Sequence, residues 1–235
     1  MGIARISMLS FREGASDAAR AELVERVRQM TALAAPAAGG LVATDLPPNR
    51  NGGDIIWRLE FASEADYESL MAAPEWRQAE AALQADPALA AAETFAFTPL
   101  AVGERGEERR GGLYRLLVLA LEEGTPPDLR ARFEAEMAAM PSYVSSIHRW
   151  NFARVTDSAG PHRWDYLWEQ EYTDLAGFRG EYMSHPYHWG VVDIWYDPDN
   201  PARIVKPYLC NSFCDIDAPV MFTRWPRPTA TPFPG

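Results

Sequence analysis

An internal repeat is the feature that most constrains the fold of this chain of 235 residues. The segment 54–61 (DIIWRLEF) aligns without a gap with 165–172 (DYLWEQEY), so that Asp, Trp, Glu and an aromatic residue recur at identical spacing. Further positions upstream repeat at nearly the same offset: Arg5, Leu9, Glu13 and Gly14 correspond to Arg115, Leu119, Glu123 and Gly124. Because two matches with nearly equal offsets seldom arise by chance, the sequence predicts two copies of one structural unit.

Each copy contains strand-like and helix-like segments in the same order. Short apolar runs closed by turn residues predict strands, and apolar residues at helical spacing predict helices. The expected segments of the first copy are 3–11, 16–33, 40–44, 54–61, 64–84 and 94–100, and those of the second are 113–121, 126–140, 145–155, 164–172, 174–184 and 203–214. The order is therefore β-α-β-β-α-β twice, which is the ferredoxin-like unit.

The predicted fold class is α+β, with two fused ferredoxin-like repeats. A sheet with helices on one face leaves its other face to be covered. We therefore expect the two copies to cover each other and to form an intramolecular α/β barrel. The expected boundaries are 1–100 for the first repeat, 101–112 for a linker, 113–218 for the second repeat and 219–235 for a tail. The five prolines of this tail exclude a helix, so we expect it to wrap an outer surface.

Charge and composition exclude several classes of partner. The formal net charge of −11 and the absence of a basic run argue against nucleic acid and anionic membranes as partners. No apolar stretch approaches the roughly 20 residues that span a bilayer, and the first residues do not form a signal peptide. Cys210 and Cys214 match neither a redox motif nor a zinc ribbon. We expect a cytoplasmic protein, and a homodimer of the fused barrel is left open.

Titratable side chains distinguish the second copy from the first. All four histidines lie in the second copy, at 148, 162, 185 and 188. When the two copies are aligned so that Pro74 matches Pro186, Ala73 aligns with His185 and Trp76 aligns with His188. Any acid–base chemistry is therefore expected in the second copy, and the first copy is expected to carry a degenerate site.

The stretch His185-Pro186-Tyr187-His188, with Tyr182 before it, resembles the stress-responsive A/B-barrel (Dabb) family. The resemblance spans roughly residues 3 to 216 and implies ferredoxin-like units that usually dimerise into a barrel, fused in tandem members. In the plant polyketide-cyclase branch of that family, the second histidine of His-Pro-x-His acts as acid/base with a tyrosine six residues earlier. Those positions are His188 and Tyr182 here. That branch also has a histidine in its first strand, where this chain has Arg115, and the difference puts a polyketide substrate in doubt.

The residues themselves support an acid–base site next to aromatic side chains. Histidine titrates near neutral pH, a tyrosine hydroxyl could orient it, and Asp193 could orient a histidine. The candidate catalytic residues are His188, Tyr182 and His185. The candidate substrate-binding residues are His148, Trp150, Trp164, Tyr166, Trp168, Arg115, Tyr187 and Asp193. The bland interpretation is that most of the rings form the core and that the polar groups tie a helix end to the sheet.

Neither a metal nor an organic cofactor is expected. A metal site of His185, His188 and Asp193 would lack a fourth ligand, and no nucleotide or phosphate fingerprint occurs. The leading hypothesis is a cofactor-independent enzyme that acts on an aromatic or polyketide-like molecule by a cyclase or aldol-type step, or by the reverse lyase or decarboxylase step. The alternatives are a non-catalytic stress-responsive or ligand-binding protein and a cofactor-free monooxygenase of related barrels.

Overall fold

A computed structural model describes residues 3–35, 37–44, 51–105 and 111–225, and it divides the chain into two compact units. Unit 1 comprises residues 1–98, 155–163 and 220–226, and unit 2 comprises 99–154, 164–219 and 227–235. The last part of one long strand, Leu89–Glu104, is thus assigned to unit 2, and the end of another, Ile147–Ala159, to unit 1. In the described part of the chain, no helix is long and apolar enough to cross a membrane.

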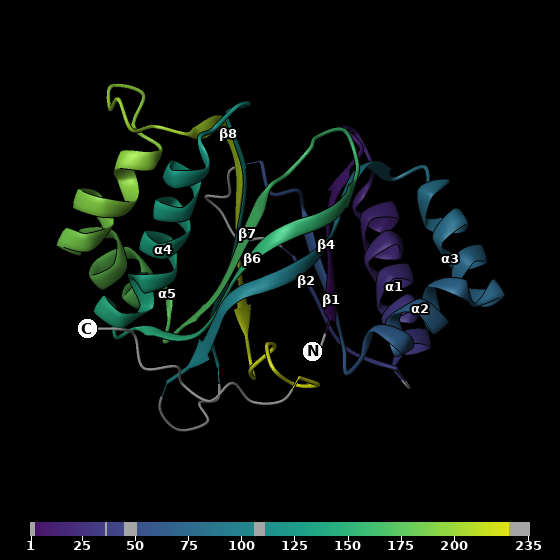
Figure 1. Cartoon of the computed structure of the whole chain (residues 1–235). Coiled ribbons are helices and arrows are strands. Elements are labelled where there is room, and N and C mark those ends of the chain that lie inside the picture. The colour runs from purple at the N-terminus through teal and green to yellow at the C-terminus, as the bar shows by residue number, and fades with distance from the viewer. Residues whose placement is uncertain (1–2, 36, 45–50, 106–110, 226–235) are drawn as a thin grey trace. The chain divides into compact units, whose positions relative to one another are not determined.

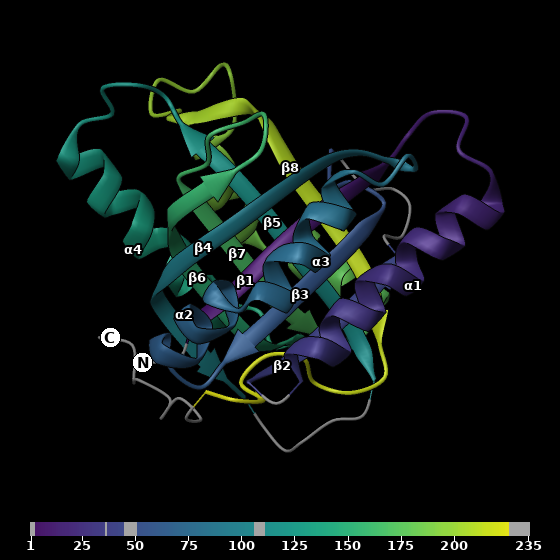
Figure 2. The same ribbon diagram turned by 90° about the vertical axis from the view of Figure 1, so that its right-hand side faces the viewer.

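Unit 1 contains a four-stranded antiparallel sheet with helices on one face (Figures 1 and 2). Its elements are β1 (Ile3–Phe11), α1 (Asp17–Ala34), β2 (Ala38–Thr44), β3 (Ile55–Phe61), α2 (Glu64–Ala72), α3 (Pro74–Gln84) and β4 (Leu89–Glu104), and the strand order is β2-β3-β1-β4. The Ser16 side chain caps α1 by accepting from the Ala19 N–H. Leu23, Val27 and Met30 of α1 are buried at helical spacing against the sheet.

Unit 2 repeats this topology. Its elements are β5 (Gly112–Leu121), α4 (Pro127–Tyr143), β6 (Ile147–Ala159), β7 (Tyr166–Tyr172), a helical stretch made of α5 (Leu175–Gly177) and π-helical turns at Phe178–Tyr182 and His188–Val192, a 3₁₀ turn at Asp193–Trp195, and β8 (Val205–Ile216). The strand order is β6-β7-β5-β8, which matches that of unit 1 position by position. The α+β class and the two ferredoxin-like repeats are therefore confirmed, and closure into one barrel stays a prediction.

The residues that repeat in the sequence also repeat their structural roles. The carboxylate of Asp54 accepts from the Phe11 N–H at 2.6 Å, and that of Asp165 accepts from the Leu121 N–H at 2.7 Å. The turn after the first strand of each unit has a glycine with positive φ, Gly14 at 78° and Gly124 at 75°. The duplication is thus visible in individual hydrogen bonds as well as in the order of elements.

Several boundaries differ from the sequence-based expectation. The helix expected over 64–84 is broken at Ala73, because Pro74 disfavours the helical conformation of the residue before it. Pro186 breaks unit 2 in the same way at His185, and a second helical stretch that the sequence analysis missed follows from 186 to 195. The segment expected to link the copies is strand at both ends, since β4 ends at Glu104 and β5 begins at Gly112, and residues 106–110 lie outside the described part.

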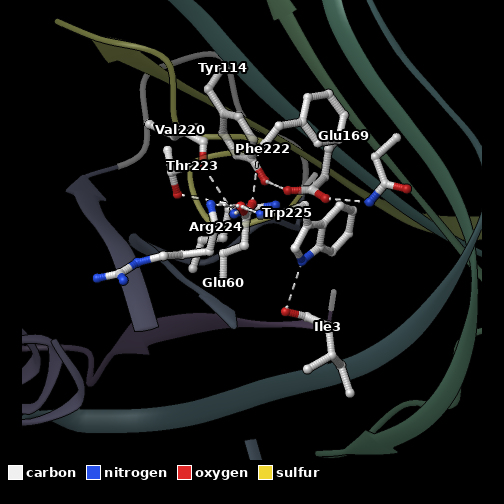
Figure 3. A network of polar contacts seen from close by, with 11 residues as sticks. Ile3, Glu60, Tyr114, Glu169, Val220, Phe222, Thr223, Arg224 and Trp225 are labelled. Carbon is white, nitrogen blue, oxygen red and sulfur yellow. Dashed lines mark hydrogen bonds and ion pairs between the residues drawn. The ribbon is translucent and has the colours of Figure 1, made fainter. Parts of the chain in front are cut away.

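The tail is also placed differently from the expectation, as far as it is described. Met221, Phe222 and Trp225 are buried in unit 1 rather than spread over a surface. The reason is the buried carboxylate of Glu60 on β3, which accepts from the backbone N–H groups of residues 222, 224 and 225 at 2.6 to 3.1 Å (Figure 3). Arg58 donates to the same carboxylate at 2.7 Å. Residues 226–235 lie outside the described part.

Candidate functional site

The candidate site lies in unit 2, between the sheet and the helical stretch that carries Tyr182 and His188. Both residues lie in π-helical turns, Phe178–Tyr182 and His188–Val192. Such turns are rare in proteins, and those that occur often lie at functional sites. They aim both rings inward, so that Tyr182 is 1% exposed and His188 7% exposed.

His188 lies beside an aromatic ring and a carboxylate. Its ring lies 4.5 Å from the ring of Tyr182 between centroids, at an interplanar angle of 62°. Its Nδ1 lies 3.4 Å from a carboxylate oxygen of Asp193, and this buried nitrogen makes no hydrogen bond within the described part of the chain. Asp193 is half exposed, so a carboxylate at the protein surface faces a histidine that is almost fully buried. A carboxylate in this place can orient the histidine.

Tyr182 connects this histidine to a buried arginine. Nη1 of Arg115, on β5, donates to the Tyr182 hydroxyl at 2.9 Å and to the Gln170 side-chain oxygen at 2.6 Å. Its Nε donates to the Asn211 side-chain oxygen at 2.9 Å. The guanidinium also lies over the rings of Phe178 and Tyr182, at 5.3 and 5.0 Å from their centroids. All of these partners are electrically neutral.

The protein environment changes the pKa values of this cluster. Burial raises the pKa of the Tyr182 hydroxyl, and the nearby Arg115 only partly offsets this. Burial also raises the pKa of Tyr172, whose hydroxyl donates to Gln170 at 2.8 Å. Burial opposes the charge of Arg115, but the oxygens of Tyr182 and Tyr172 outweigh it and raise the guanidinium pKa. The site therefore combines neutral tyrosine hydroxyls with a permanent cation.

Two of the candidate residues near the helix break lie outside this cluster. The Nδ1 of His185 accepts from the Tyr187 backbone N–H at 3.1 Å, which is a local bond across the proline turn. The ring of Tyr187 stacks on Tyr143 of α4 at 4.1 Å, and its hydroxyl donates to the Glu136 carbonyl at 2.9 Å. Tyr187 thus fastens the helical stretch to α4, and the bond of His185 stabilises the proline turn.

The aromatic candidates are distributed over unit 2 rather than gathered around His188. Tyr166 and Trp168 pack with Phe152, and Phe133 of α4 closes this group against Tyr166 and Phe152. Trp164 stacks on Tyr208 at 5.7 Å. The remaining two lie at the start of β6: Trp150 packs against Gly103, and the His148 carbonyl accepts from the Arg105 N–H. Most of these rings are core, which the sequence analysis gave as the bland interpretation.

The sequence analysis named Tyr182 and His188 as candidate catalytic residues and Arg115 and Asp193 as candidate substrate-binding residues. The structure places these four close together. The sequence analysis missed Gln170, Asn211 and Phe178, which surround Arg115. In the described part of the chain, no group of three or more His, Cys, Asp or Glu side chains is placed to hold a metal ion.

One family model matches part of the chain. The model described as Stress responsive A/B Barrel Domain (Dabb) matches residues 113–200, a range that contains Arg115, Tyr182 and His188. A comparison with curated protein sequences found no match.

Solved structures share the fold at low sequence identity. A candidate monooxygenase from Lactobacillus acidophilus NCFM has a TM-score of 0.53 and 10% identity, over 90% of this chain and 92% of that chain. An anthrone oxidase-like protein has a TM-score of 0.55 and 9% identity, over 92% and 91%. A candidate monooxygenase from Fusobacterium nucleatum has a TM-score of 0.55 and 8% identity, over 92% of both chains. At these identities the likeness concerns the fold alone.

Proposed function

We propose that unit 2 is a cofactor-independent enzyme site in which His188 transfers a proton to and from a small molecule. The observation that carries the proposal is the placement of His188, a buried imidazole whose Nδ1 faces the Asp193 carboxylate and whose ring packs against Tyr182. A general base needs a defined orientation, and the Asp193 carboxylate faces the Nδ1 of this histidine. A role in binding a small molecule is common to this proposal and to its non-catalytic alternative.

Arg115 and Tyr182 have a different role in the proposed reaction. When His188 removes a proton from a carbon next to a carbonyl, negative charge develops on the carbonyl oxygen. A buried guanidinium and a neutral hydroxyl can stabilise that charge, because both donate hydrogen bonds in surroundings of low dielectric constant. The arginine takes the place of the first-strand histidine of the polyketide cyclases, so the proposed site stabilises an oxyanion with a fixed charge.

The proposed substrate is an aromatic or polyketide-like molecule, and the proposed reaction forms or breaks a carbon–carbon bond. In the forward direction, the enolate carbon attacks a second carbonyl, and the proton held by His188 is returned to the new alkoxide. The reverse reaction uses the same groups in the opposite order. Both directions need one base and one stabilised oxyanion, which is the set of groups near His188.

An oxidation is the alternative reaction, favoured by the description of the structural neighbours as candidate monooxygenases and as an anthrone oxidase-like protein. In such a reaction, an activated CH₂ group would be deprotonated and oxidised by O₂ to a carbonyl, with the second oxygen atom leaving as water. Oxygen uptake on addition of substrate would favour this alternative over the cyclase or lyase reaction. Binding without turnover would favour a non-catalytic role.

The test compares the wild type with His188→Gln on a panel of phenolic and polyketide-like compounds, with products identified by mass spectrometry. We expect product from the wild type and its loss in a folded His188→Gln variant. His162→Gln, in unit 1, is the matched control, and it should retain full turnover. Equal turnover by the wild type and His188→Gln would rule out proton transfer by His188.

We also propose that unit 1 is a second, degenerate Dabb-type repeat. The support is the identical strand order of the two units and the repeated roles of Asp54 and Asp165. A test is to compare turnover by the full-length variants Arg5→Gln, in unit 1, and Arg115→Gln, in unit 2. If unit 1 is degenerate, Arg5→Gln should keep its turnover, and loss of turnover in a folded Arg5→Gln variant would contradict the proposed division of roles.

A further inference from the structure

The clearest difference between the two units concerns the arginine of their first strand. Arg5 and Arg115 occupy equivalent positions, because Arg5 lies opposite Leu59 in the β1–β3 pairing and Arg115 lies opposite Gln170 in the β5–β7 pairing. Arg5 donates from Nη2 to the Glu80 carboxylate of α3 at 2.5 Å. The cation of unit 1 is therefore neutralised within its own fold.

Arg115 has no such partner. It is 5% exposed, and no carboxylate of the described residues lies within 4 Å of its guanidinium. Its Nε and Nη1 donate to Asn211, Gln170 and Tyr182, which are all uncharged side chains. The difference from Arg5 that matters is therefore the missing carboxylate. A buried charge that lacks a counter-charge is costly and calls for an explanation.

A buried donor without an acceptor lies beside this cation. The Gln170 side chain is fully buried, and its oxygen accepts from Arg115 and Tyr172. Its Nε2 is buried and has no hydrogen-bond partner in the described part of the chain. Buried amide donors normally find an acceptor. Among the described residues, two adjacent groups of unit 2 thus lack a partner: the Arg115 cation has no carboxylate within 4 Å, and the Gln170 amide has no acceptor for its Nε2.

The corresponding positions of unit 1 have lost these polar groups together with the unpaired charge. Leu59 stands where unit 2 has Gln170, as the strand pairing shows. Alignment on the prolines places Leu70 at the position of Tyr182 and Trp76 at that of His188. In unit 1, Arg5 has a carboxylate partner and the neighbouring polar groups are missing. In unit 2, the polar groups are present beside Arg115 and, among the residues described there, the carboxylate is missing.

We propose that the ligand of unit 2 is an organic anion, a carboxylate or a stabilised enolate or phenolate, whose oxygen pairs with Arg115 and accepts from Gln170. The inference rests on the proposed function of unit 2 as a small-molecule site and specifies its substrate class. The ligand supplies the negative charge that Glu80 supplies in unit 1. A planar guanidinium presents several N–H donors to an anion in a fixed geometry, whereas a lysine presents a single ammonium group. A lysine at position 115 would therefore not replace the arginine fully.

The test measures thermal stabilisation of the full chain by sodium formate, acetate, benzoate and 2-naphthoate, each against its primary amide at constant ionic strength. We expect at least one carboxylate to raise the melting temperature of the wild type while its amide does not. Arg115→Gln should abolish this rise, and Arg5→Gln, the matched control in unit 1, should retain it. Stabilisation by amides and carboxylates alike, its persistence in Arg115→Gln, or no stabilisation by any carboxylate would overturn the proposal.

A second variant keeps the test decisive if Arg115→Gln does not fold. Gln170→Glu places a carboxylate beside Arg115 inside the fold, as Glu80 is placed beside Arg5. This variant should fold, and it should lose the carboxylate effect while keeping its arginine. The His188→Gln variant separates the two proposals. If His188→Gln loses turnover but carboxylates do not stabilise the wild type more than amides do, the proton-transfer role stands and the anion site alone is overturned.

Discussion

The imidazole of His188 packs against the phenol ring of Tyr182, with 4.5 Å between the centroids, yet the Tyr182 hydroxyl accepts its hydrogen bond from Arg115. The tyrosine therefore contacts the base through its ring and the cation through its oxygen. The resemblance to polyketide cyclases paired this tyrosine directly with the histidine. In the structure, the partner of the Tyr182 hydroxyl is Arg115, which donates a hydrogen bond to it.

Replacing Tyr182 by phenylalanine separates these two contacts. Tyr182→Phe keeps the ring against His188 and removes the hydroxyl from Arg115. We expect kcat to fall about 10²-fold, as for the loss of one donor at a developing oxyanion, with the melting temperature little changed. Tyr143→Phe, on the exposed side of α4, is the control and should leave kcat unaltered. An unchanged kcat in Tyr182→Phe would exclude the hydroxyl from the reaction.

Asp193 is expected to act as a positioning residue through His188. Asp193→Asn keeps the size of the side chain and removes the charge that lies 3.4 Å from the histidine Nδ1. We expect kcat to fall about 10-fold, with KM nearly constant, because the carboxylate is proposed to orient the base rather than to contact the substrate. Asp199→Asn, in the exposed turn that follows, is the comparison. A rise in KM at constant kcat would show instead that Asp193 contributes to binding.

The repeated aspartates provide a matched pair for stability. Asp54 and Asp165 each accept a backbone N–H of the first strand of their unit, from Phe11 and Leu121. Replacing either by alanine leaves that N–H without its acceptor, and each change should cost about 2 kcal/mol of unfolding free energy. Urea unfolding followed by far-UV circular dichroism measures both losses. A loss confined to one of the two variants would contradict their equivalence.

The order of elements was predictable because its signals are local. Glycines with positive φ at 14 and 124 and the strand-length apolar runs before them are legible in the sequence. The helix breaks were legible too, since Pro74 and Pro186 disfavour a helical residue before them, but the single helix expected over 64–84 ran through Pro74. The π-helical turns depend on packing against the sheet, and no local sequence pattern predicts them.

The site was predictable in part, for a related reason. His188 and Tyr182 stand in one motif, whereas Gln170 and Asn211 reach Arg115 through strand pairing, from β7 and β8. Pairing register is a long-range property, so residue types alone do not reveal it. The composition of an aromatic cluster, moreover, does not distinguish rings that bind a ligand from rings such as Phe152 that pack in the core.

The same limit applies to Glu60, whose burial could be predicted from its strand but whose partners could not. Burial alone would raise its pKa, but the Arg58 guanidinium and the backbone N–H groups of Arg224 and Trp225 outweigh this and lower it. A carboxyl with a lowered folded pKa stabilises the folded state above its unfolded pKa of about 4.3. That stabilisation is lost as the pH falls through the folded value.

We therefore expect Glu60→Gln to destabilise unit 1 by about 3 kcal/mol at pH 7, as for other broken buried ion pairs, and the difference from the wild type to shrink below pH 4. Urea unfolding at pH 7 and pH 3.5, followed by tryptophan fluorescence, measures both effects, because Trp225 is buried next to this carboxylate. Glu68→Gln, on the exposed face of α2, should change neither value. If the difference in unfolding free energy between the wild type and Glu60→Gln stayed the same at both pH values, the charge of Glu60 would not be what holds residues 222–225.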